Sequence, residues 1–107
     1  MITVLFDKFL TALEKEVERR NKEFGDQGVH WNTVYPFYRV KSNEDCVMVE
    51  CAVYKKKRRW QSTMTHKEFE MNATKPGEKL PSEDQIPQIV TFFVDLVTNK
   101  ARGDLMI

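Results

Sequence analysis

The spacing of apolar residues changes along this chain, and the change restricts the folds that it can adopt. In residues 3–24 the apolar side chains recur at steps of three and four, so they share one face of a helix. In several segments between residues 33 and 66 they instead alternate with polar side chains, which is typical of half-buried strands. Helical spacing returns near residue 84 and continues to about residue 100. The pattern therefore predicts a helix, a run of strands and a second helix.

Three segments are expected to form strands: residues 33–41, 46–54 and 60–66. Pro36 cannot donate a backbone hydrogen bond, so we expect the first strand to lie at an edge of the sheet or to be bulged there. In the second strand, one set of alternate residues is small and apolar, and we expect this set to face the core: Val47, Val49, Cys51 and Val53.

A fourth, shorter strand is predicted at residues 68–72. Phe69 and Met71 fall on the opposite parity from Trp60 and Met64, so the two pairs cannot lie on the same face of one regular strand. A bulge or a turn near residues 65–68 accounts for this shift.

The last helix is unusually apolar. Ser82 and Gln85 have the spacing of a capping box, and Pro87 is tolerated only in the first turn, so we expect the helix to begin as late as Asp84. Its polar stripe is narrow, and apolar side chains occupy the rest of its circumference. One sheet cannot cover such a helix, which favours a homodimer whose interface includes Phe92, Phe93 and Leu96.

These elements predict one α+β domain that spans residues 1–107. Short connections favour an antiparallel meander, in the order α-β-β-β(-β)-α, with both helices on one face of the sheet in a two-layer sandwich. The element order is similar to that of double-stranded-RNA-binding domains. However, those domains bind phosphates at the start of the second helix, and here "SEDQ" would repel them, so the sequence does not fit that family.

The overall charge is nearly balanced. Seventeen basic and 16 acidic residues give a net charge of +1, whereas dedicated nucleic-acid-binding proteins are usually far more basic. Any basic binding surface must therefore be local.

The first residues, "MITVLFDKFL", do not resemble a secretory signal, because no basic region precedes the apolar run. No apolar stretch of the sequence is long enough to span a membrane. We expect a cytoplasmic protein that does not bind membranes.

Catalytic and metal-binding patterns are scarce. Cys46 and Cys51 are five residues apart, so in one strand they point to opposite faces and can neither pair with each other nor share a metal. His30 and His66 are the only histidines, and the sequence has no metalloprotease, hydrolase, phosphate-loop or dinucleotide motif. We therefore expect no enzyme activity, no metal, no cofactor and no small-molecule substrate.

One short stretch, "YKKKRRWQ", concentrates positive charge. We call residues 55–59 the basic run; it consists of Lys55, Lys56, Lys57, Arg58 and Arg59. Tyr54 and Trp60 flank it and supply rings that can stack on bases, while arginine can bind phosphate with two parallel hydrogen bonds. The same pattern also fits a solvated turn, or a charged sheet edge that prevents aggregation.

Two functions fit these features. The first is a small non-enzymatic protein that contacts nucleic acid or another polyanion through a basic hairpin at residues 54–60. The alternative is a protein–protein interaction module that binds an acidic protein or a second copy through the last helix or the sheet face. An inhibitor, an adaptor and a chaperone-like homodimer are examples of this second class.

Overall fold

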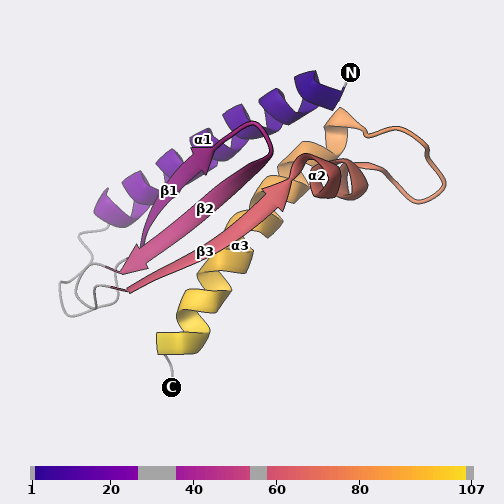
Figure 1. Ribbon diagram of the computed structural model, residues 1–107. Helices are drawn as coiled ribbons and strands as arrows, with labels where there is room; N and C mark the ends of the chain where they lie inside the picture. Colours follow the sequence, from indigo (N-terminus) through magenta and orange to yellow (C-terminus); the bar gives the residue numbers. More distant parts are fainter. Residues whose placement is uncertain (1, 27–35, 54–57, 106–107) are drawn as a thin grey trace.

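The computed structural model describes residues 2–26, 36–53 and 58–105. Figure 1 shows the arrangement of its elements, which confirms the predicted α+β class. The helices and strands are α1 (Ile2–Asp26), β1 (Pro36–Ser42), β2 (Cys46–Val53), β3 (Arg58–Thr65), α2 (His66–Ala73), a short 3₁₀ helix η1 (Glu83–Gln85) and α3 (Ile86–Leu105).

The strands form an antiparallel meander in the order β1-β2-β3. Strand β1 is an edge strand, as Pro36 predicts, so the missing N–H of Pro36 does not interrupt the centre of the sheet. Asn21 of α1 binds this strand through both polar atoms of its side-chain amide. Its Nδ2 donates to the carbonyl of Tyr38 and its Oδ1 accepts from the N–H of Tyr38, each at 2.9 Å. The two bonds satisfy backbone groups that an edge strand otherwise leaves unpaired.

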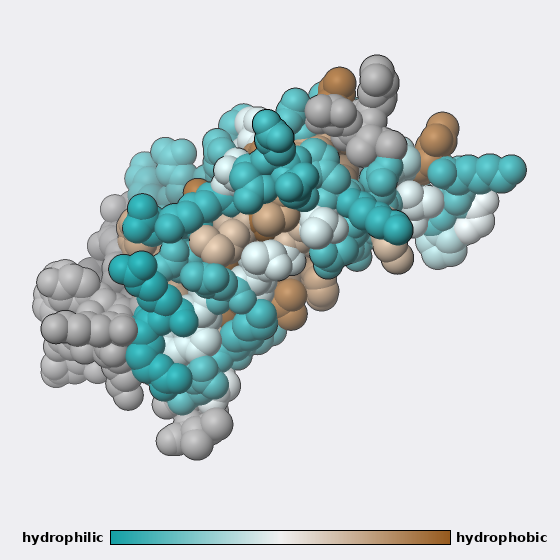
Figure 2. Space-filling model, in the orientation of Figure 1, coloured by the Kyte–Doolittle hydropathy of each residue, from teal (hydrophilic) through white to brown (hydrophobic). Residues whose placement is uncertain are grey.

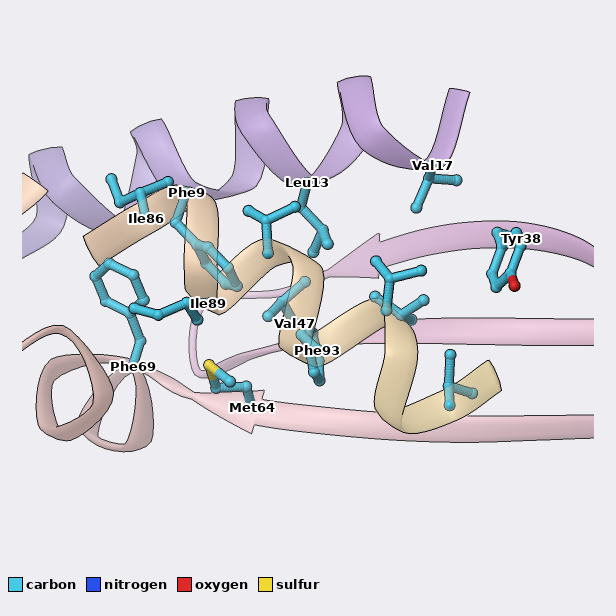
Figure 3. Packing of buried hydrophobic residues seen from close by; sticks show 14 of the residues in the cluster. Phe9, Leu13, Val17, Tyr38, Val47, Met64, Phe69, Ile86, Ile89 and Phe93 are labelled. Atoms are coloured by element: carbon cyan, nitrogen blue, oxygen red, sulfur yellow. The ribbon is translucent and has the colours of Figure 1, made fainter. Parts of the chain in front are cut away.

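Helices α1 and α3 run along the same face of the sheet, as predicted (Figure 1). Figure 3 shows side chains from both helices and from the strands pointing toward one another in a single core. The predicted inward set of β2 is confirmed for Val47, Val49 and Cys51, which are fully buried. The remaining buried apolar side chains of the strands are Tyr38, Trp60 and Met64.

The predicted fourth strand at residues 68–72 is wrong, because this segment lies in helix α2. Thr65 ends β3 and caps the helix: its hydroxyl accepts from the N–H of Glu68 at 3.1 Å, and Glu68 accepts from the N–H of Thr65 at 3.2 Å. Phe69 is buried and stacks on Phe9, with 4.8 Å between ring centroids. The shift in parity that suggested a bulge is thus the transition from strand to helix.

The start of α3 differs in detail from the predicted capping box. The Ser82 side chain does not cap the helix; its hydroxyl donates to the carboxylate of Asp84 at 2.6 Å, and η1 precedes the helix. Pro87 lies in the first turn of α3, where its missing N–H has no helical partner to lose. The helix then continues past the predicted end at Lys100 to Leu105.

Polar contacts also connect the two long helices to each other and to the sheet. Arg20 of α1 donates to Glu16 at 2.7 Å and to Asp95 of α3 at 2.9 Å. A hydrogen bond from Arg19, together with the Arg20 bond, holds the pKa of Glu16 at about 2. In the interior, the hydroxyls of Tyr38 and Thr98 lie 2.7 Å apart and hydrogen-bond each other, so both buried groups are satisfied.

Candidate functional site

The face of the sheet turned away from α1 and α3 carries three cross-strand rows of side chains, and we call it the open face. Its side chains alternate along each strand with those that face the helices. Figure 2 shows mostly hydrophilic side chains over the strands, around a smaller group of more apolar ones. The register defines the rows as Phe37–Ala52–Arg59, Arg39–Glu50–Gln61 and Lys41–Met48–Thr63.

The open face is positively charged. Its rows hold three exposed cations, Arg39, Lys41 and Arg59, against one carboxylate, Glu50, which gives a local net charge of +2. Glu50 is only 2% exposed. Arg59 approaches it at 3.3 Å and Lys41 at 3.9 Å, so the buried charge has cationic partners while the cations stay accessible to solvent.

The basic run does not form a single patch where the structure describes it. Arg58 and Arg59 begin β3, and the alternation of a strand sends them to opposite faces. Arg58 lies on the helix side, where it pairs with Asp104 of α3 at 3.4 Å and approaches the ring of Trp60. Arg59 belongs to the open face. Tyr54 and the lysines at positions 55–57 lie outside the described residues.

Trp60 does not have the position expected of a base-stacking residue. Its side chain is only 7% exposed and lies in the core, and its indole Nε1 donates to the carboxylate of Asp104. Burial of the ring is the physical reason for correcting the prediction, because a buried ring presents no face to a ligand. Trp60 is therefore removed from the predicted stacking residues.

Among the described residues of the open face, Phe37 is an exposed aromatic side chain that the sequence did not single out as a candidate site residue. It is 46% exposed, while its neighbour Tyr38 is 1% exposed in the core. The alternation of a strand is the signal for this difference, because it sends the neighbouring side chains of Phe37 and Tyr38 to opposite faces.

The three predicted interface residues of α3 separate into two groups. Phe92 and Leu96 are 55% and 39% exposed, and their spacing of four places them on one face of the helix. Phe93 is fully buried and lies 6.2 Å from Phe9 between ring centroids, so it cannot contact a partner. The prediction that Phe93 belongs to an interface is corrected for this reason.

The cysteines differ in their surroundings. Cys51 is fully buried on the core side, and burial raises the pKa of its thiol to about 11, so this sulfur is a poor nucleophile. Cys46 lies at the other end of β2 and is partly exposed.

Within residues 2–26, 36–53 and 58–105, no three histidine, cysteine or acidic side chains gather in a way that could hold a metal ion. None of the described helices is both long and apolar enough to cross a membrane.

Comparisons with protein families, with curated proteins and with solved structures found no significant match.

Proposed function

We propose that the protein is a non-enzymatic polyanion-binding protein that contacts nucleic acid weakly, without reading its sequence. The site consists of the basic run and the adjoining open face of the sheet. The contact is local, because a net charge of +1 for the whole chain provides little long-range attraction.

The observation that supports this proposal most strongly is the excess of cations at one end and one face of the sheet. Arg58 and Arg59 follow the lysines of the basic run and begin β3, and Arg59 shares the open face with Arg39 and Lys41. Only one carboxylate, Glu50, lies among these cations in the cross-strand rows. Exposed guanidinium and ammonium groups on one face of a sheet can contact several phosphates at once.

The salt dependence of binding tests the proposal. Contacts to three to five phosphates give a slope of about −3 to −4.5 for log affinity against log salt on duplex DNA. Replacing Lys55, Lys56 and Lys57 by alanine is expected to make this slope shallower by about 2 to 3, since each lost contact removes about 0.9. Fluorescence anisotropy with a labelled oligonucleotide at several salt concentrations measures both slopes.

A matched control separates local from overall charge. Replacing Lys15, Lys22 and Lys79 by alanine lowers the net charge equally, but at exposed sites on α1 and in the segment before η1. This control is expected to keep the slope of the unmodified protein, and both triple variants should keep its thermal stability. Equal slopes in the two variants, or no binding by the unmodified protein at very low salt, would contradict the proposal.

A second candidate function, self-association through α3, is favoured by the exposure of Phe92 and Leu96. These two apolar side chains are adjacent on the surface of the helix, next to a shallow groove lined in part by Pro87, Thr91 and Asp95. Removing such a patch from water by pairing two copies is favourable. We therefore propose a homodimer with α3 at its interface.

Charge on this helix face is expected to abolish the homodimer. The double substitution Phe92→Asp and Leu96→Asp places two carboxylates on each copy, so like charges face each other across a two-fold interface. Both sites lie outside the core, so the fold of each copy should be kept. Light scattering at tens of micromolar should then report a dimer for the unmodified protein and a monomer for the variant. A monomeric unmodified protein would rule out this second function.

A further inference from the structure

The open face combines an aromatic ring and a cation in a single cross-strand row. Phe37, Ala52 and Arg59 lie side by side on β1, β2 and β3. Both flanking residues are exposed, since Phe37 is 46% accessible and the Arg59 side chain 65%. The central residue is alanine, which is the smallest side chain of the three rows. Other exposed large apolar residues of the described chain lie on α1, α2, α3 or the segment before η1, so Phe37 is the one carried by a strand.

The dimensions of this row suit a flat ring. Neighbouring strands are about 4.8 Å apart, so the backbones that carry Phe37 and Arg59 are separated by about 10 Å. A planar group above Ala52 would lie about 5 Å from the strand that carries Phe37 and about 5 Å from the strand that carries Arg59. This spacing falls within the roughly 4.5–7 Å separation between the ring centroids of stacked aromatic pairs. Both flanking groups suit such a guest, because a phenyl ring stacks on it and a guanidinium binds its π face.

Phosphate contacts are available in the next two rows. Arg39 and Lys41 follow Phe37 along β1 at two-residue steps on the same face, so they lie about 7 and 14 Å from it along the strand. A ligand with one planar group on the first row can therefore extend a negatively charged backbone over these two cations. A polymer with alternating bases and phosphates has this combination of groups.

We propose that the open face binds single-stranded nucleic acid, with one base held between Phe37 and Arg59 above Ala52 and the adjoining phosphates on Arg39 and Lys41. This inference rests on the proposed polyanion binding and adds the class of ligand. Single strands are preferred because the bases of a duplex are stacked on one another and cannot be inserted between protein side chains.

Two substitutions that leave the charge unchanged test the base contact. Phe37→Ala removes the stacking ring, and Ala52→Leu fills the centre of the row. The probes are fluorescein-labelled oligothymidine and fluorescein-labelled heparin, which is a polyanion without bases. Each variant is expected to weaken oligothymidine binding at low salt by roughly 5- to 150-fold, which is the range for the loss of one base–aromatic stack. Heparin binding should not change.

The control is Met71→Ala, which removes an exposed apolar side chain from α2, outside both the open face and the proposed dimer interface, and should leave both affinities unchanged. Circular dichroism confirms that each variant is folded. If Phe37→Ala leaves oligothymidine binding unchanged, or weakens both probes equally, base stacking is overturned while the basic surface remains. If the unmodified protein binds neither probe, the polyanion function itself fails, and this inference fails with it.

Discussion

Trp60→Ala is expected to destabilise the protein by about 3–5 kcal/mol, which is the usual cost of removing a large aromatic side chain from a core. The ring is 7% exposed, and its Nε1 is a hydrogen-bond donor to Asp104. The variant therefore loses packing and also one hydrogen bond to this carboxylate, which keeps its contact with Arg58 at 3.4 Å. Because a domain of this size has only about 5–15 kcal/mol of stability, chemical denaturation will show the change clearly.

The binding of the folded variant gives the complementary result. Under conditions where Trp60→Ala remains folded, it should bind oligothymidine as tightly as the unmodified protein, since the buried ring contacts no ligand. Trp60→Phe, which keeps an aromatic ring but lacks the N–H, should be destabilised less. A stable Trp60→Ala variant that loses oligothymidine binding would show that the ring stacks on bases at the surface.

Phe93→Ala is expected to cost about 3–5 kcal/mol of stability, whereas Phe92→Ala at the neighbouring position should change it by about 0.5 kcal/mol or less in the monomer. The two residues have the same side chain and adjacent positions in α3. They differ in environment: Phe93 is fully buried against Phe9, and Phe92 is 55% exposed.

Denaturant unfolding at low protein concentration measures both effects, because dilution separates monomer stability from any contribution of a dimer. The reverse order of the two losses would mean that α3 is rotated about its axis relative to the sheet. In that case Phe92, and not Phe93, would supply the core.

Periodicity predicted most of the fold. A three- or four-residue spacing identified α1 and α3, alternation identified the three strands, and Pro36 correctly indicated an edge. The prediction for residues 68–72 failed because Phe69 and Met71 alternate as they would in a strand, whereas in helix α2 only Phe69 is buried and Met71 is exposed. The T-x-x-E pattern at Thr65 and Glu68 was the signal that distinguishes a helix start, and in the structure it forms a capping box.

The candidate site was less predictable, since it depends on which residues of different strands lie next to each other. The basic run stands out in the sequence, but the row of Phe37, Ala52 and Arg59 is set by the strand register. A shift of one residue in either pairing would change which side chains share a row. Likewise, Phe92 and Phe93 cannot be distinguished by composition, because only the orientation of α3 on the sheet decides which one is buried.

The location of the nucleic-acid contact is tested most directly by the backbone amide NMR spectrum during titration with oligothymidine at low salt. We predict that the largest shifts occur on the open face, at Phe37, Arg39 and Arg59, and that the amides of Thr91 and Phe92 on α3 do not move. Shifts confined to α3, or no shifts at any amide, would contradict the account.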